Sequence, residues 1–202
     1  MSERATIDVS ALPDHGFGSR SVMWWATVLV ILIEATVFVA TITSYFYLQG
    51  NEAAWPPPDT PLPGLEWPTV NTIILLVSLL PNQFVKAAAE KMELRKVQIG
   101  MIVADLIAIG FVAVRVLEFA HLNVRWDSSA YGSITWTLLG FHTFHLVTDL
   151  FDSIVLTVLM FTRHGREPKR FVDASENCFY WYFVVLSWLP IYAVLYWAPR
   201  IL

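Results

Sequence analysis

The chain has 202 residues, of which 56% are hydrophobic and 15% are charged, and its formal net charge is −4. Soluble domains are about 45–50% apolar, whereas the apolar residues here come in long blocks with most charges in the gaps. The single cysteine, Cys178, excludes a disulfide framework and a zinc site built from cysteines. No stretch resembles a phosphate-binding loop, a nucleophile elbow or a nucleic-acid patch. The composition therefore indicates a membrane protein with no nucleic-acid partner.

Five segments are long enough to cross a hydrocarbon layer about 30 Å thick, which takes about 20 helical residues. They cover about residues 21–48, 69–90, 96–122, 131–162 and 172–198. Backbone polar groups inside lipid must be satisfied, and the alternation typical of barrel strands is absent, so each span is expected to be a helix. We predict an all-α, polytopic membrane protein with an N-terminal tail over residues 1–20 and a bundle of five transmembrane helices over residues 21–202.

The lysines and arginines of the short loops predict the orientation of the chain. If the helices alternate, ten of them fall on one side: Arg4, Arg20, Lys86, Lys91, Arg95, Lys96, Arg163, Arg166, Lys169 and Arg170. The other side has Arg125 and Arg200, with Arg115 near that end of the third span. The N-terminus is therefore expected on the cytoplasmic side and the C-terminus outside. Arg166, Lys169 and Arg170 are candidates for contacts with lipid headgroups.

Glu34 is the one charged residue of the first span. At about 1.5 Å per residue it lies about 20 Å from the start of that span, where a charge is costly and usually faces protein, water or a partner. One interpretation is a carboxyl group that exchanges protons or binds a partner. The other is a protonated glutamic acid that is hydrogen-bonded to another helix.

His142 and His145 are three residues apart in the fourth span, so they share a helical face. Their depth overlaps that of Glu34, which makes a His–Glu contact between the first and fourth spans possible. A pair of histidines supplies at most two metal ligands, and no other motif completes a site. A haem would need an axial histidine on a facing helix, and the remaining intramembrane candidate, His121, belongs near the outer surface.

Further acids lie at membrane depth. Asp149 and Asp152 continue from the histidines toward the cytoplasmic half. They are expected either to line a hydrated path or to meet basic residues of the loop between the second and third spans, and Asp105 has the same alternatives. Arg115 and Glu118 are three apart on the third span, and this spacing predicts a local ion pair.

The order of these features resembles subunit III of the haem–copper oxidases, the cytochrome c oxidase group, over about residues 17–198. The resemblance rests on Glu34 with SYFYL, on AWPPP and VNTIILLVS, on LEFAHL with Glu118 and His121, on SSAYGS with GFHTFH, and on ENCFYWYFVVLSW. Five spans match the short bacterial form of that family. The chain departs from the family pattern in having Tyr182 for histidine, Val185 for aspartate, Arg115 for glutamine and Asp149 for glycine.

The resemblance implies a non-catalytic subunit in a bacterial inner membrane, with a cytoplasmic N-terminus and a periplasmic C-terminus. Such a subunit packs on subunit I, has no haem, copper or other metal of its own, binds phospholipid, and supports proton uptake and turnover stability in aerobic electron transport. Haem and copper are then expected in partner subunits. His142 and His145 are expected to tie the fourth helix to Glu34. The residues expected to be structural or proton-related are Glu34, His142, His145, Glu118, His121, Asp149 and Asp152.

Three alternatives remain at the level of sequence. The chain could be an accessory subunit of a nitric oxide reductase or a quinol oxidase, or a structural lipid-binding subunit with no proton role. It could also be a small proton-coupled transporter that uses Glu34, His142 and Asp149. A transporter needs a substrate cavity near the midplane, often with broken helices, whereas these spans contain few internal glycines or prolines.

Overall fold

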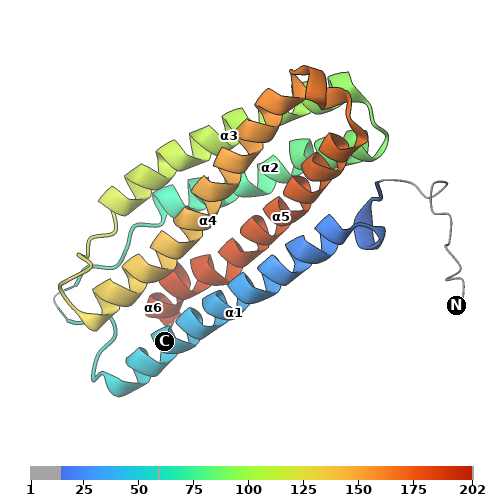
Figure 1. The fold of residues 1–202 in the computed structure, drawn as a ribbon. Coiled ribbons are helices and arrows are strands. Elements are labelled where there is room, and N and C mark those ends of the chain that lie inside the picture. Colours follow the sequence, from blue (N-terminus) through green and yellow to red (C-terminus); the bar gives the residue numbers. More distant parts are fainter. Residues whose placement is uncertain (1–14, 59, 202) are drawn as a thin grey trace, which may run out of the picture.

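The computed structural model describes residues 15–58 and 60–201, which form a bundle of five long helices (Figure 1). The helices are α1 (Val22–Asn51), α2 (Glu66–Glu90), α3 (Leu94–Ala120), α4 (Ala130–Met160) and α5 (Pro168–Tyr192). A π-helical turn, Ala193–Trp197, continues α5 into α6 (Ala198–Ile201), so the fifth span covers Pro168–Ile201. The five predicted spans are thus all helical, with ends that differ by a few residues. Residues 1–14 of the predicted tail, including Arg4, lie outside the described residues.

All five helices are long and apolar enough to cross a membrane. Large apolar side chains cover the outside of the bundle, as in Leu80, Phe151 and Leu186, which are 73%, 70% and 62% exposed. A helix that is apolar on its outer face as well as its inner face is expected in lipid rather than in water. The described residues therefore form a multi-pass membrane protein.

Local sequence signals mark where the helices begin. The Ser21 hydroxyl accepts a hydrogen bond from the backbone N–H of Met23 at 3.1 Å, and the Ser129 hydroxyl accepts one from Gly132 at 3.1 Å. Both are N-cap contacts that satisfy backbone donors at a helix start. Pro168 opens α5, where its missing N–H costs nothing.

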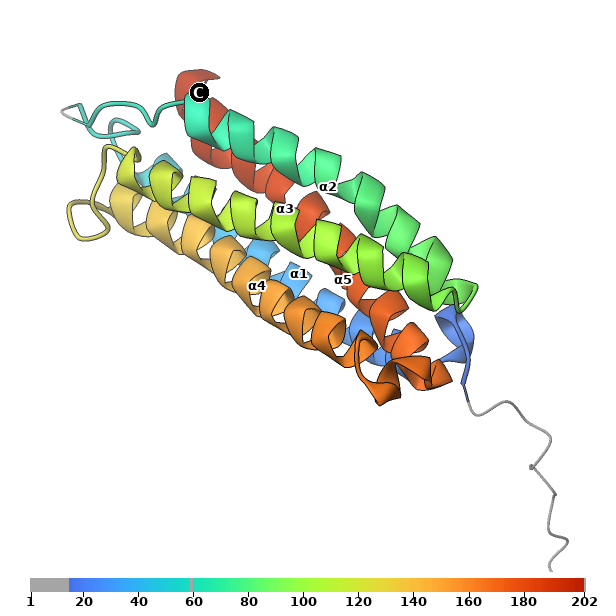
Figure 2. The same cartoon turned by 90° about the horizontal axis from the view of Figure 1, so that it is seen from above.

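α5 lies at the centre of the bundle and packs against α1, α2 and α4. α2 and α3 lie side by side on one face, and α1 lies on the far face (Figure 2). Among the long helices α1 packs against α4 and α5. Only 6% of its most apolar 18-residue stretch is buried within the described part of the chain. α1 is therefore the helix with the largest share of its surface open to lipid or to a partner.

The core consists of two apolar clusters. The larger one is built around residues such as Leu75, Leu139 and Trp188, and the smaller one around residues such as Val97 and Met160. Buried polar side chains lie where the two clusters meet: Ser78, Asn82, Asp105 and Asp149. A layer of hydrogen-bonding groups thus interrupts the hydrophobic interior.

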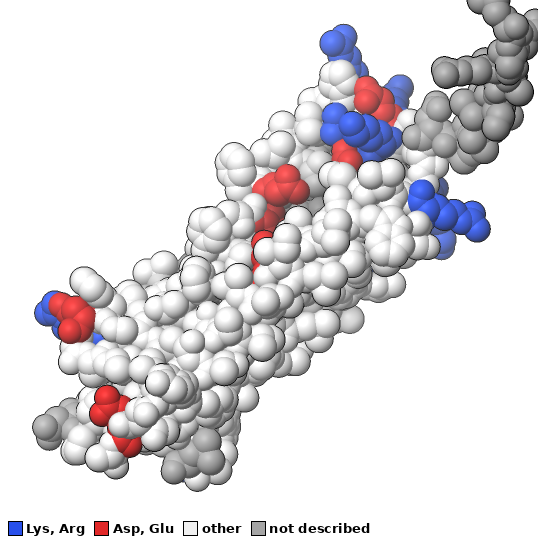
Figure 3. Space-filling view, turned by 60° about the horizontal axis from the view of Figure 1, so that its bottom comes forward, with Lys and Arg blue, Asp and Glu red and all other residues white. Residues whose placement is uncertain are grey.

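Lysine and arginine gather at one end of the bundle, which we call the basic end (Figure 3). It contains the α2–α3 connection and the turn Arg163–Arg166 before α5. Lys86 was predicted in the loop between the second and third spans, but it lies within α2, where its ammonium group contacts Glu90 at 3.1 Å and donates to Ser175 at 3.0 Å. The reason is that KAAAE continues α2 with good helix formers up to Glu90.

Candidate functional site

Glu34 is held by one residue from each of two neighbouring helices. The Tyr180 hydroxyl of α5 donates a hydrogen bond to Glu34 Oε2 at 2.6 Å, and Nδ1 of His145 on α4 lies 3.4 Å from Glu34 Oε1. The Tyr180 hydroxyl also lies 3.4 Å from that same imidazole nitrogen. These three side chains join α1, α4 and α5. The carboxyl group is not fully enclosed, because the Glu34 side chain is 21% exposed.

The contact between Glu34 and the fourth span is present through His145, whereas Tyr180 was not predicted. Tyr180 lies in the stretch FYWYF, where Tyr182 has the same side chain two residues later. The Tyr182 hydroxyl instead donates to Gln83 of α2. Residues two apart on a helix point to different sides, and only the rotation of α5 in the bundle decides which tyrosine reaches Glu34.

His142 does not contact Glu34, so the prediction that both imidazoles hold this acid was wrong for His142. Its Nε2 lies 2.9 Å from the Val184 carbonyl oxygen, and its Nδ1 lies 3.3 Å from Nη2 of Arg115. Three residues along a helix rotate a side chain by about 60° and advance it by about 4.5 Å. His145 therefore meets α1, while His142 turns into the interior toward α3.

The partners of His142 determine its tautomer. A guanidinium group can only donate, so Nδ1 must be the acceptor from Arg115. Nε2 then carries the hydrogen that is donated to Val184. The side chain is fully buried, with 0% exposure. Both nitrogens are thus used within the chain by a neutral imidazole.

Arg115 and Glu118 form a buried ion pair at 2.9 Å, as their spacing predicted, and each side chain is 1% exposed. Glu118 also accepts hydrogen bonds from Asn71 of α2 at 2.5 Å and from Tyr196 in the π-helical turn. The Arg115 guanidinium lies over the ring of Trp188, 4.1 Å from its centroid. We call Asn71, Arg115, Glu118, His142 and Tyr196 the buried polar cluster. It joins α2, α3, α4 and the end of the fifth span.

His121 is the remaining histidine of the predicted set, and it lies outside this cluster. It follows α3 as the C-cap residue, where its Nδ1 contacts the Leu117 carbonyl at 2.7 Å. Its ring is 5.8 Å from that of Trp67. His121 is thus exposed at the end of α3 that leads into the α3–α4 loop.

The intramembrane aspartates are bonded to neutral side chains. Ser153 and Thr157 donate to Asp105 at 2.5 and 2.6 Å, and Asn177 donates to Asp149 at 3.0 Å. Among residues 15–58 and 60–201, the ion pairs include none with Asp105, Asp149 or Asp152. Of the two predicted alternatives, pairing with basic loop residues is therefore not what the structure shows.

An open groove of about 620 Å³ runs between α1, α4 and α5. Asp149, Asp152 and Tyr180 line it, and Lys169 and Arg170 line it toward the basic end. The Arg170 guanidinium pairs with Asp173 at 2.8 Å. Arg166, the third predicted headgroup ligand, is exposed in the turn before α5 and is not part of the groove wall.

The histidines and acids do not converge as metal ligands. Within the part of the chain that the structure describes, no group of three or more histidine, cysteine, aspartate or glutamate side chains could hold a metal ion. Instead, the arrangement can hold and exchange protons at carboxyl groups and can hold the helices together through buried hydrogen bonds.

Comparison with known proteins gives one consistent result. A family model described as "Cytochrome c oxidase subunit III" matches residues 5–199, which include all five long helices. A cytochrome c oxidase subunit 3 from Synechocystis is 29% identical over 187 residues, which are 90% of this chain and 78% of that protein. A probable cytochrome c oxidase subunit 3 from Mycobacterium tuberculosis is 26% identical over 189 residues, 90% of this chain and 91% of that protein. A cytochrome c oxidase subunit 3 from Neurospora crassa is 28% identical over 194 residues, which are 93% of this chain and 72% of that protein.

Proposed function

The chain belongs to the cytochrome c oxidase subunit III family, and from this premise we propose that it binds phospholipid and supports proton uptake for the oxidase. Family membership makes it a subunit of a haem–copper oxidase, in a membrane complex with other oxidase subunits. We propose that subunit I is the partner on which it packs. Haem and copper then belong to the partner subunits, and this chain has no catalytic residue.

One observation carries the proton role: Tyr180, which donates to Glu34, also lines the groove that contains Asp149 and Asp152. An acid that is hydrogen-bonded to a hydroxyl in the wall of a groove can take up or release a proton through that hydroxyl. General acid–base groups need hydrogen-bonded access of this kind. Glu34 is therefore proposed as an acid that exchanges protons with the groove.

The same groove supports the lipid role. Its walls include apolar side chains such as Val30, Val155 and Leu159, which suit an acyl chain. Lys169 and Arg170 lie at its basic end, where cationic side chains attract anionic headgroups. We propose an anionic phospholipid with its phosphate at Lys169 and a chain against α1 and α4.

The histidines are proposed to be structural. Both nitrogens of His142 are bonded within the chain, and His145 is bonded to Glu34. The imidazole of His142 is therefore not free to be an axial haem ligand. The charge distribution supports a cytoplasmic basic end and a periplasmic C-terminus in a bacterial inner membrane.

The test of the proton role is the Glu34→Gln variant of the assembled oxidase. Glutamine keeps the size of the side chain and removes the exchangeable acid, so the number of turnovers before inactivation should fall severalfold. Glu52→Gln is the matched control, because Glu52 is exposed at the other end of α1. An unchanged turnover lifetime in Glu34→Gln would leave only the structural, lipid-binding role.

The test of the subunit assignment is co-purification. A tagged chain should bring down a haem–copper subunit, and the tagged chain produced without its partners should show no Soret absorbance. Haem bound to the chain alone would reject the proposal. The identity of the catalytic subunit that co-purifies also separates this proposal from a nitric oxide reductase or a quinol oxidase.

A further inference from the structure

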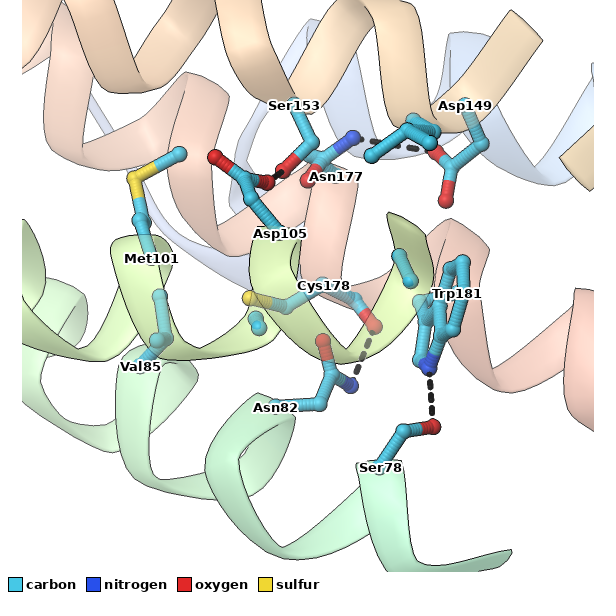
Figure 4. A pocket seen from close by; sticks show the side chains of 13 residues that line it. Ser78, Asn82, Val85, Met101, Asp105, Asp149, Ser153, Asn177, Cys178 and Trp181 are labelled. Carbon is cyan, nitrogen blue, oxygen red and sulfur yellow. Dashed lines mark hydrogen bonds between the residues drawn. The ribbon is translucent and has the colours of Figure 1, made fainter. Parts of the chain in front are cut away.

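A small cavity with both polar and apolar side chains lies between α2, α3, α4 and α5, apart from Glu34 (Figure 4). Its volume is about 30 Å³. One water molecule needs about 10–15 Å³ measured in this way, so the cavity has room for about two. Its polar lining comes from Ser78, Asn82, Asp105, Asp149, Ser153 and Asn177. A cavity of this size is too small for an organic ligand, and its polar side chains can form hydrogen bonds with water.

Asp149 has a free hydrogen-bonding position that faces this cavity. The residue is 6% exposed, and its Oδ1 accepts a hydrogen bond from Asn177 at 3.0 Å. In residues 15–58 and 60–201 no donor is bonded to its Oδ2, which points toward Trp181 (Figure 4). A carboxyl oxygen in the interior of a bundle is expected to have a hydrogen-bond donor. A donor that is not part of the chain, such as a bound water molecule, would satisfy it.

Asp105 faces the same cavity from α3. It is 7% exposed, and the hydroxyl groups of Ser153 and Thr157 donate to its two oxygens. Each of these oxygens can accept a further hydrogen bond. Water in the cavity can therefore bridge Asp105 and Asp149 across the interface of α3 and α4.

The surroundings of the two aspartates contain more acids than bases. The titratable groups that line the cavity or the groove, or contact those that do, include Glu34 on α1, Lys86 and Glu90 on α2, His145 and Asp152 on α4, and Lys169, Arg170, Asp173, Glu176, Cys178 and Tyr180 on α5. Lys86 is bonded to Glu90 and Ser175, and Arg170 pairs with Asp173. Burying two ionised carboxylates with no cation bonded to either has a large free-energy cost, so both are not expected to be charged at once. At least one of the pair therefore keeps its proton.

The cavity and the open groove share two wall residues, Asp149 and Asn177. The Asn177 amide nitrogen lies 3.0 Å from Asp149 Oδ1 and 3.5 Å from Asp152 Oδ2, and Asp152 is exposed on the groove side. The side chain of Asn177 thus lies between the cavity and the groove.

We propose that this cavity is an internal water site in which bound water links Asp105 and Asp149, and that the pair stores one exchangeable proton. In release, the O–H bond of the protonated carboxyl breaks, and the proton passes to a cavity water and then past Asn177 to water at Asp152. Uptake is the reverse of this sequence. The site does not involve Glu34 or lipid, so its existence does not depend on the function proposed above.

The water is tested by radiolytic hydroxyl-radical labelling of the intact oxidase complex, in which bound water that is split by X-rays oxidises the side chains next to it. Met101 lines the cavity and is 2% exposed, while Met160 is 1% exposed and does not line it. Met101 should be oxidised severalfold faster than Met160. Equal rates for these two buried methionines would overturn the water site, and this comparison needs no variant.

The stored proton is tested by infrared spectroscopy of the same complex, through the carbonyl band of a protonated carboxylic acid. Asp149→Asn or Asp105→Asn should remove or shift a band that moves on exchange into deuterium oxide, and Asn177→Leu should slow that exchange. Asp127→Asn, in the α3–α4 loop, should leave the band in place. A spectrum that neither aspartate variant changes would overturn proton storage. A Glu34→Gln variant with an unchanged turnover lifetime would refute the proton role proposed for Glu34 and leave the present proposal standing.

Discussion

The guanidinium carbon Cζ of Arg115 lies over the indole ring of Trp188, 4.1 Å from the ring centroid. This contact places a fully buried cation in a span that must cross lipid. An aromatic face attracts a cation, and the attraction is larger where water is excluded. Together with the Glu118 carboxylate 2.9 Å away, it explains how a charge can be kept at this depth.

The buried ion pair predicts unequal effects of single and double substitutions. Arg115→Leu or Glu118→Leu should each lower the free energy of unfolding in detergent micelles by about 3–5 kcal/mol, because each leaves an unpaired buried charge. The double variant should lose much less than the sum of the two. Arg125→Leu, in the exposed pair with Asp127, should have no measurable effect and is the control. Additive losses in a denaturant titration would contradict the pairing.

Two glycines of α4 predict opposite outcomes for the same substitution. A Cβ at Gly132 would lie 2.1 Å from the Arg125 carbonyl oxygen, whereas a Cβ at Gly140 has nothing within 4 Å. Gly132→Ala should therefore lower the melting temperature of the chain, since backbone must move. Gly140→Ala should be neutral or stabilise the chain by about 0.4–1 kcal/mol, because alanine has less freedom in the unfolded state. Equal melting temperatures for the two variants would contradict the close approach at Gly132.

The proposed headgroup site predicts that two basic residues at the basic end differ in their effect on bound phospholipid. Lys169 lines the groove and Arg166 does not. Lys169→Gln should reduce the anionic phospholipid that remains on the purified complex, while Arg166→Gln should leave it unchanged. Native mass spectrometry counts the bound lipid in each case. An equal loss in the two variants would point to a diffuse surface attraction instead of a headgroup site.

The orientation is predicted from the basic end. In a Cys178→Ala background, Asp127→Cys should react with a membrane-impermeant maleimide in intact cells. Lys91→Cys should react only after the membrane is opened, because lysine-rich and arginine-rich loops stay on the cytoplasmic side. Cys178 is buried, so its removal should affect only the background signal. The reverse pattern of labelling would invert the orientation.

The turn before α5 predicts a pH effect outside the membrane. The hydrogen bond with His164, 2.7 Å away, is the main reason why the pKa of Glu167 lies below its ordinary value. A lowered pKa means that the contact contributes fully above the ordinary pKa and is lost as the pH falls through the lowered one. His164→Ala should raise the pKa of Glu167 toward its ordinary value in a carbon-13 NMR titration. An unchanged titration would show that the nearby Lys169 and Arg170 dominate.

The sequence by itself determined the five helices and the Arg115–Glu118 pair. Both are local properties: a span follows from about 20 consecutive apolar residues, and residues three apart are neighbours on any helix. The sequence also determined which end of the bundle carries most basic side chains, because the lysines and arginines lie in the short loops that join the spans. These features would be the same in any packing of the five helices.

Only the tertiary structure decided which polar groups meet. It places Tyr180 and not Tyr182 at Glu34, turns His142 toward Arg115, and brings Ser153 and Thr157 to Asp105. The physical reason is that a helix in lipid is apolar on nearly all sides, so its sequence carries little information about its rotation. That rotation is set by the close packing of small and large side chains between helices, and a turn of about 60° is enough to give a side chain a different partner.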